Sequence, residues 1–304
     1  MNLNKKLAIL FLCIAIIPII ILEGISISEI SDDLITQKEL ALDSSLVSTI
    51  SNIEHYLDTR QIQAKLFAST FLPLQVDSTK IKDPSTTNRI QSQIDSMLEE
   101  TTSNSLNNSG EIDQKSKIDI IFVTDLNGNI LASTQKGLIS KKLSTEFSEQ
   151  IRKNKPYFGG FSKNGGLSTN YITFSSNLSD SDNNSYGNIL IQTSLLILES
   201  ESLGVYFENN NEIFLVDNTF RQITRDSGIK YSTLNWNTES GLIDRCFADQ
   251  PISEKYINKN SKEVLGILKL LDEENMCIIG EIELEKILSP IYNLSYYLHF
   301  QFYL

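Results

Sequence analysis

The stretch IDIIFVTDLNGNILAST, residues 118–134, predicts a β-hairpin and is the most informative segment for the fold. Residues 118–124 are rich in β-branched and aromatic side chains, and Asp125 opens an Asp-Leu-Asn-Gly sequence that suits a tight turn. A second strand-like run, residues 129–134, follows the turn directly. Because the segments before this hairpin have helical spacing, we expect a chain that combines helices with antiparallel strands.

Further segments after the hairpin complete a module of helix and sheet. Residues 144–152 have helical spacing, and residues 170–176 and 188–195 predict strands that flank the polar loop SDSDNNSYG. A glycine-rich loop precedes these strands at Gly159, Gly160, Gly165 and Gly166.

The same order of elements recurs further along the chain. EIFLVD at residues 212–217 lies 92 positions after IIFVTD at residues 120–125, and CIIGEIEL at residues 277–284 lies 89 positions after NILIQTSL at residues 188–195. Two nearly equal offsets indicate a duplicated module.

A long helix is expected ahead of both modules. Apolar side chains alternate at spacings of three and four, interrupted by one arginine, in the series Leu46, Ile50, Ile53, Leu57, Arg60, Ala64, Phe67 and Phe71. With an earlier apolar set they predict a helix of about 45 residues that ends at Leu72-Pro73. This stripe can pack on the chain's own modules, support a parallel dimer, or do both. A shorter amphipathic helix is expected around Ile90, Ile94, Met97 and Leu98.

An uncharged apolar run from Leu7 to Leu22 predicts a membrane-spanning helix. Lys5 and Lys6 precede the run, so the positive-inside rule places the N-terminus in the cytoplasm and the bulk of the chain outside. A cleaved signal peptide, with small residues at 24–26, is the alternative. We favour the anchor because the helical pattern continues past the run.

Composition and charge exclude several classes of protein. The chain has 26 basic and 38 acidic residues and a net charge of −12, which opposes nucleic-acid binding. A hydrophobic content of 40% is enough to build a packed core. Cys246 and Cys277 allow one disulfide or two buried thiols, and we favour the thiols.

The sequence contains no motif that indicates catalysis, a metal or a cofactor. Phosphate-binding loops, dinucleotide fingerprints and nucleophile elbows are missing. His55 and His299 fall in the stalk and the tail, so they are not expected to meet. Residues 180–191 begin like a calcium loop but end in Ile191 where a bidentate glutamate is needed. We therefore expect no enzymatic activity, no metal and no cofactor.

The chain resembles the double Cache sensors of prokaryotic receptors. Residues 118–134 resemble the first hairpin of the membrane-distal module. EVLGILKLLDEENMCIIGEIELEKILSPI, residues 263–291, resembles the strand pair and exit helix of the membrane-proximal module, especially as found on sensor histidine kinases. The resemblance covers about residues 5–292 and implies an α+β fold. That fold comprises an N-terminal transmembrane helix, a long stalk helix and two tandem PAS-like antiparallel sheet modules flanked by helices.

The resemblance also implies a division of the chain. We expect an anchor at 1–25, the stalk at 26–72, a membrane-distal module at 73–200, a membrane-proximal module at 201–286, and an exit helix or truncated second transmembrane segment at 287–304. Family members continue into a cytoplasmic output domain, whereas this sequence ends at Leu304. A truncated or split gene product and a dedicated binding subunit both remain open.

The function implied is extracytoplasmic sensing of a small solute at the cell membrane, by a homodimer or a receptor heterodimer. A scaffold without ligand, which pairs with an intact receptor, is the alternative, and an exported enzyme is a remote third. The arginine-x-tryptophan-tyrosine signature of amino-acid sensors is missing from residues 144–177, which argues against an amino-acid ligand. Strand alternation places Tyr171, Thr173 and Ser175 on one face. The expected ligand-binding residues are Thr124, Arg152, Tyr157, Tyr171, Thr173, Ser175 and Thr193.

Overall fold

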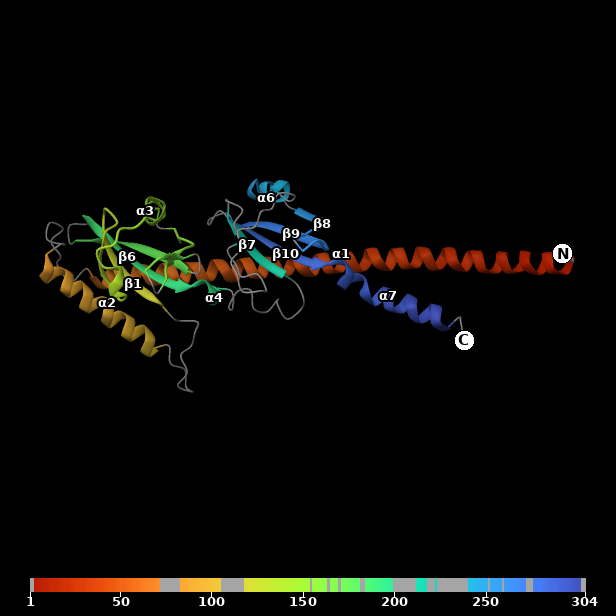
Figure 1. Cartoon of the computed structure of the whole chain (residues 1–304), viewed down its shortest axis with the longest axis horizontal. Coiled ribbons are helices and arrows are strands. Elements are labelled where there is room, and N and C mark those ends of the chain that lie inside the picture. Colours follow the sequence, from red (N-terminus) through yellow and green to blue (C-terminus); the bar gives the residue numbers. More distant parts are fainter. Residues whose placement is uncertain are drawn as a thin grey trace.

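One helix, α1 (Leu3–Phe71), forms the axis of the molecule, and both sheets lie along it (Figure 1). The computed structural model describes residues 3–71, 83–104, 118–153, 155–162, 165–168, 171–180, 184–198, 212–217, 222, 240–250, 252–258, 260–271 and 276–301. Within these ranges, side chains are described except at residues 3–25, 71, 102–104, 240 and 293–301. The helix ends two residues before Pro73, as predicted.

The first sheet follows α1 and the helix α2 (Pro84–Asn104). Its strand order is β2-β1-β6-β5, with all neighbours antiparallel. The strands are β1 (Ile120–Asp125), β2 (Ile130–Ser133), β5 (Tyr171–Ser179) and β6 (Ser185–Ser194). The smaller elements are the 3-10 turn η4 (Lys136–Leu138), α3 (Thr145–Arg152), β3 (Gly160–Phe161), β4 (Leu167–Ser168) and α4 (Leu195–Leu198). We call this sheet and its helices the first module.

The second module contains a sheet of order β7-β10-β9-β8, again antiparallel. Its strands are β7 (Glu212–Asp217), β8 (Ile252–Ile257), β9 (Glu263–Leu271) and β10 (Met276–Glu283). Helix α6 (Ser240–Phe247) packs on this sheet, and α7 (Leu284–Gln301) leaves it beside α1, towards the N-terminal end (Figure 1).

Register shows that the two sheets repeat one arrangement. β1 pairs with β6 through Ile120 and Gln192, and β7 pairs with β10 through Glu212 and Glu281. These pairs match at the offsets of 92 and 89 positions noted in the sequence. The third strands, β5 and β9, add to β6 and β10 on the same side. Each central strand then passes directly into a helix, α4 or α7.

The buried stripe of α1 packs on the inner faces of both sheets. Leu46, Ile53, Leu57 and Ala64 are at most 2% exposed and belong to one core with strand residues of both modules. A Cβ added at Gly280 of β10 would lie 3.0 Å from a Leu42 methyl, so this glycine lets α1 approach the sheet closely. The expected packing of the stripe on the chain's own modules is therefore what the structure shows.

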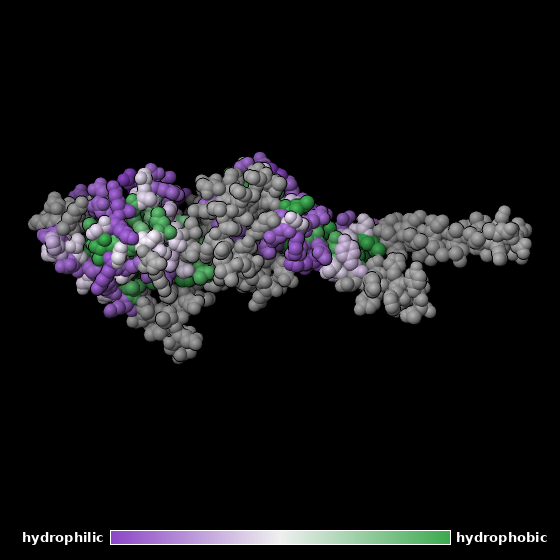
Figure 2. All heavy atoms as spheres, in the orientation of Figure 1, coloured by the Kyte–Doolittle hydropathy of each residue, from purple (hydrophilic) through white to green (hydrophobic). Residues whose placement is uncertain are grey.

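Helices α3 and α6 cover the opposite faces of the two sheets, away from α1 (Figure 1). Ser144 caps α3 by accepting a hydrogen bond from the Phe147 amide at 3.2 Å. Mostly hydrophilic side chains coat the end of the molecule that carries the first module (Figure 2). The core of each module thus has two layers, one against α1 and one against its own short helix.

The hairpin prediction is confirmed, because β1 and β2 pair around a turn in which Gly128 has φ 79°. The preference for two thiols is wrong. Cys246 of α6 and Cys277 of β10 form a disulfide, with Cα atoms 6.3 Å apart. Fold geometry brings them together, since α6 lies directly over β10, and their spacing in the sequence does not reveal this.

The apolar run at residues 7–22 belongs to α1, in the part whose side chains the structure does not describe. Among the residues whose side chains the structure describes, no helix reaches the length and hydropathy that a membrane span requires.

Candidate functional site

The outer face of the first sheet, covered by α3, carries three rows of side chains set by strand register. Each row takes one residue from β1, β6 and β5 in turn: Ile120–Gln192–Thr173, Phe122–Leu190–Ser175 and Thr124–Asn188–Asn177. We call these the first, second and third rows. They differ in how fully the chain covers them.

Aromatic side chains fill the space over the second row. Phe147 of α3 stacks on Tyr157 with ring centroids 4.2 Å apart, and Phe161 meets Phe122 edge to face at 5.8 Å. Phe122 and Phe147 are fully buried in this cluster. The middle of the face is therefore closed by the chain itself.

Gln192 closes the first row. Its side chain accepts a hydrogen bond from the Phe161 amide at 2.7 Å and donates one to the Phe161 carbonyl at 2.8 Å. A Cβ on Gly160 would approach Gln192 Oε1 to 2.3 Å, so the strand can come this close only with glycine there. The Gln192 side chain thus pairs with both backbone polar groups of Phe161, as a neighbouring strand would, and holds β3 over the sheet.

The third row is open and lines a pocket of about 190 Å³. Its walls come from β1 and the β1–β2 turn, from α3, and from the facing ends of β5 and β6. The lining residues are Thr124, Asp125, Leu126, Gly128, Leu143, Ser148, Ile151, Arg152, Asn177, Ser185 and Asn188. We call it the third-row pocket.

Two side chains in this pocket have unused polar groups. Thr124 is fully buried, and its hydroxyl has no hydrogen-bond partner among the described residues. Arg152, in the last turn of α3, is exposed, and none of the hydrogen bonds and ion pairs between described residues involves its guanidinium. A buried hydroxyl without a partner is unfavourable, so a group that binds it is favoured.

The pocket's carboxylate is occupied by the turn. Asp125 accepts hydrogen bonds from the amides of Asn127 at 2.9 Å and Asn129 at 2.8 Å, and from the Asn129 side chain at 2.7 Å. This arrangement fixes the β1–β2 hairpin. The oxygens of Asp125 are therefore engaged by the turn, and Arg152 is the charged lining residue whose hydrogen-bonding groups remain for a ligand.

The structure separates the seven expected binding residues. Thr124 and Arg152 meet in the third-row pocket. Tyr157 is stacked on Phe147, while the Thr173 hydroxyl donates to the Gly159 carbonyl at 2.7 Å. The hydroxyl of Ser175 likewise donates to a backbone carbonyl, that of Ile151, at 3.4 Å.

Thr193 and Tyr171 lie elsewhere, which corrects the expectation of one shared pocket. Thr193 is on the opposite face, where its hydroxyl lies 3.1 Å from that of Tyr56 on α1, because neighbouring strand residues point to opposite sides. Tyr171 lines a separate pocket of about 270 Å³ with Leu98, Asp119, Ile120, Thr134 and Gln135. Burial, and then the nearby Asp119 charge, raise the pKa of Tyr171.

Asn177 and Asn188 are pocket residues that the sequence reading missed. They face each other directly in the β5–β6 register, and Asn188 also pairs with Thr124. Asparagine is uncommon inside strands. Asn188 opens the predicted strand 188–195 and Asn177 directly follows the predicted strand 170–176, so their positions are a usable signal. Their shared row becomes visible only once register is known.

The second module presents three equivalent rows to α6. They are Glu212–Glu281–Gly266, Phe214–Ile279–Leu268 and Val216–Cys277–Leu270. Its third row is apolar, and the Cys246–Cys277 disulfide ties α6 to it. The position equivalent to the third-row pocket is therefore closed by a covalent bond.

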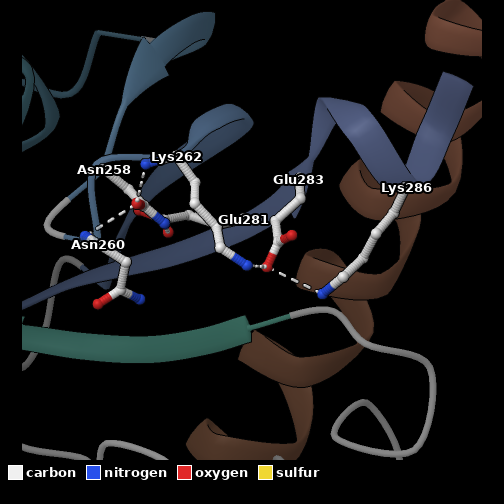
Figure 3. A network of polar contacts seen from close by, with 6 residues as sticks. All are labelled: Asn258, Asn260, Lys262, Glu281, Glu283 and Lys286. Carbon is white, nitrogen blue, oxygen red and sulfur yellow. Dashed lines mark hydrogen bonds and ion pairs between the residues drawn. The ribbon is translucent and has the colours of Figure 1, made fainter.

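Polar groups near the second module's first row are paired, as Figure 3 shows for most of them. Buried Glu281 accepts hydrogen bonds from the Tyr256 hydroxyl at 2.7 Å and the Asn258 amide at 2.9 Å. At the end of β10, Glu283 binds Lys262 at 2.8 Å and Lys286 at 3.0 Å. Its hydrogen bond with Lys262 leads the causes that lower the pKa of Glu283, and the same bond raises the pKa of Lys262.

Comparisons with known proteins agree on the architecture. Neither models of protein families nor curated protein sequences match the chain. Among solved structures, the extracellular domain of the histidine kinase vpHK1S-Z8 matches with a TM-score of 0.56 and 12% identity, over 86% of this chain and 96% of that one.

Two chemoreceptor domains match comparably. The sensory domain of Campylobacter jejuni Tlp3, with isoleucine bound, has a TM-score of 0.54 and 12% identity, over 84% of this chain and 97% of that one. The ligand-binding domain of Pseudomonas aeruginosa PAO1 PctB, with L-Gln, has a TM-score of 0.52 and 12% identity, over 85% and 98%. The chain therefore shares the fold of these solved extracellular sensor domains of histidine kinases and chemoreceptors.

Proposed function

We propose that this chain is the extracytoplasmic, small-ligand-sensing part of a signal-transduction receptor of the histidine kinase or chemoreceptor type. The observation that carries the proposal is a sensor-domain fold whose first module keeps an open pocket with an unpartnered buried hydroxyl, that of Thr124. Structural neighbours that were solved with isoleucine or glutamine support binding of a small solute. The chain then acts by binding and has no catalytic role of its own.

The proposed placement is at the cell membrane, with residues 1–25 as the anchor and the N-terminus in the cytoplasm. The uncharged run at residues 7–22 and the lysines before it support this orientation. The same helix continues without a break from Leu3 to Phe71, so the proposed anchor and stalk are parts of one helix. We keep the proposed limits of 26–72 for the stalk, 73–200 and 201–286 for the modules, and 287–304 for the exit segment.

Polar contacts connect the first module to the stalk, and binding can act through them. Tyr56 and Thr193 join their hydroxyls at 3.1 Å, and the Gln61 side chain donates to the Ser175 carbonyl at 2.6 Å. Both strands involved also carry third-row residues. A ligand transmits a signal only if it binds two stalk arrangements with different affinity.

A thermal-shift screen of the purified full-length chain in detergent tests the sensing function. A ligand that binds only the folded state stabilises it by RT ln(1 + [L]/Kd), so the melting temperature keeps rising as the ligand concentration exceeds Kd. We expect at least one small solute to do so, and to lose its effect when pocket residues are changed. A folded chain that no solute stabilises would contradict the proposal.

A second candidate is a scaffold that pairs with an intact receptor and binds no ligand. The observation in its favour is the closed second row, where Phe147, Tyr157 and Phe161 occupy the middle of the outer face. The outward face of α1 also exposes Leu40, Val47, Ile62 and Leu66, which suits pairing along the stalk as a homodimer or heterodimer. Co-purification with a receptor that is unaffected by Arg152→Gln would favour this candidate.

A further inference from the structure

We infer that the third-row pocket binds a small monocarboxylate, held by Arg152 at the rim and by Thr124 and the two asparagines at the floor. This inference rests on the proposed sensing function and names the chemical class of its ligand. The pocket lies at one end of the outer face, beyond the aromatic cluster that fills the middle. Its floor is a complete cross-strand row, Thr124–Asn188–Asn177, so three strands fix the spacing of its polar groups.

Thr124 indicates that the pocket is built for a polar guest. Its side chain is fully buried on β1, lines the pocket, and leaves its hydroxyl without a partner among the described residues. The equivalent residue of the second module is Val216, which fills a similar space without a polar atom. Without a ligand, a threonine at this position is less favourable than a valine, because its buried hydroxyl has lost its hydrogen bonds to water. A ligand oxygen that accepts a hydrogen bond from the hydroxyl removes this penalty.

Of the two charged lining residues, Arg152 is the one whose hydrogen-bonding groups can contact a ligand, and a guanidinium binds anions. Among the lining residues, only Arg152 is a cation and only Asp125 is an acid. The Asp125 carboxylate accepts three hydrogen bonds from the turn, whereas the Arg152 guanidinium makes none with described residues. A planar guanidinium binds a carboxylate through two parallel hydrogen bonds, and the asparagine amides supply further donors.

Size and apolar lining restrict the rest of the ligand. The volume of about 190 Å³ is below the roughly 300–1,000 Å³ of usual ligand pockets, so only a compact molecule fits. Leu126, Leu143 and Ile151 line the same space and suit a short hydrocarbon chain. An amino acid fits less well, because the oxygens of Asp125, the acid in the lining, already accept hydrogen bonds from the turn and the ammonium group would compete with those donors.

Calorimetric titration of the purified full-length chain tests the class directly, with acetate, propionate and butyrate as probes. Propionamide, alanine and inorganic phosphate are the matched comparisons for charge, ammonium and anion shape. We expect propionate or butyrate to bind and to raise the melting temperature, with propionamide at least about tenfold weaker.

Three variants assign the binding to the pocket. Arg152→Gln removes the charge at an exposed position, so it should fold normally and weaken carboxylate binding about tenfold or more. Thr124→Val should weaken it about threefold to tenfold while keeping the fold. Lys153→Gln removes the neighbouring exposed charge outside the pocket lining and should bind like wild type.

The outcomes distinguish a failure of the monocarboxylate class from a failure of the proposed sensing function. Equal binding of propionate and propionamide, equal binding of alanine, a preference for phosphate, or an unchanged Kd in Arg152→Gln would each overturn the monocarboxylate class. If a neutral solute from the wider screen binds instead, sensing stands and this inference fails. If a folded chain binds nothing at all, both fail.

Discussion

The first and second modules place the same three rows of side chains under a short helix, but they treat the third row in opposite ways. In the second module, Cys277 of that row is bonded to Cys246 of α6, and its neighbours Val216 and Leu270 are apolar. In the first module the row is Thr124–Asn188–Asn177, and a pocket remains between it and α3. The same sheet arrangement therefore carries a disulfide over the third row in one module and a pocket over it in the other.

The difference shows that two modules of one arrangement can use the same row of side chains in different ways. A row that packs against its helix can only stabilise, whereas polar groups left unsatisfied under a helix can bind something else. The first rows make a similar contrast in detail. Gln192 holds a backbone segment, while Glu281 holds two side chains, and both close their part of the face.

The largest expected effect on stability comes from removing the Cys246–Cys277 disulfide of the second module. Replacing both Cys246 and Cys277 by alanine should lower the free energy of unfolding by about 3–4 kcal/mol, because the bond spans 31 residues and restricts the unfolded chain. Urea denaturation followed by circular dichroism measures this. Reduced wild type should behave like the variant.

Thiol titration in denaturant provides the check on this prediction. With three cysteines in the chain, only Cys13 should react before reduction, and all should react afterwards. Three reactive thiols in protein that was never reduced would show that the disulfide does not form in solution.

Exchanging the first-row side chains comes next in size. Gln192→Glu should cost about 2–3 kcal/mol at neutral pH, because a buried carboxylate cannot donate to the Phe161 carbonyl. The loss should shrink in acid, where the carboxyl regains a proton. An unchanged midpoint of urea denaturation would mean that β3 is not held by this side chain.

The reverse exchange, Glu281→Gln, is the matched comparison and should cost about 1–2 kcal/mol. Its amide has a single acceptor oxygen, so it cannot accept from both the Tyr256 hydroxyl and the Asn258 amide as the carboxylate does. Asn258 cannot flip without loss, since its oxygen already accepts from the Asn260 and Lys262 amides. A variant as stable as wild type would indicate that this network rearranges freely.

Exchanging the third-row residues between the modules should change the free energy of unfolding by smaller amounts. Val216→Thr should destabilise the second module by about 1–2 kcal/mol, because it buries a hydroxyl against apolar neighbours. Thr124→Val should leave the empty chain as stable as wild type or stabilise it by up to about 1 kcal/mol. A clear loss of stability in Thr124→Val would mean that its hydroxyl has a partner in the unliganded protein.

The smallest expected effect is the pH dependence at the end of β10. Lys262 and Lys286 lower the pKa of Glu283 in the folded chain, so its contribution is present above the unfolded pKa and is lost as pH falls through the folded pKa. Because the glutamate's partners are solvent-exposed, we expect less than about 1 kcal/mol. Stability measured from neutral to acidic pH should fall slightly less in Glu283→Gln than in wild type. An identical slope in both proteins would contradict this assignment.

Local pattern was enough to predict most elements of the fold. The hairpin at residues 118–134, the helix after Ser144 and the end of α1 before Pro73 all depend on neighbours in the chain. β6 begins three residues earlier than predicted, at Ser185, because pairing with β5 extends it into the polar loop. Interactions between strands override local preference there.

The candidate site was predicted only in part. Thr124 and Arg152 were expected and do line one pocket, whereas Thr193 points to α1 and Tyr171 lies at the other end of the sheet. Asn177, aligned with Thr124 through Asn188, was not expected. Residue types suggest which side chains can bind, but register decides which of them share a face.

By itself, the sequence determined the kinds of element, their order and their repetition, because periodicity, turn residues and apolar runs act over a few neighbouring positions. The tertiary structure alone decided that Cys246 reaches Cys277, that aromatic rings close the second row, and that the third row of the first module stays open. Those features join segments far apart in the chain. They depend on strand register and on which helix covers which face, and neither can be read from local sequence.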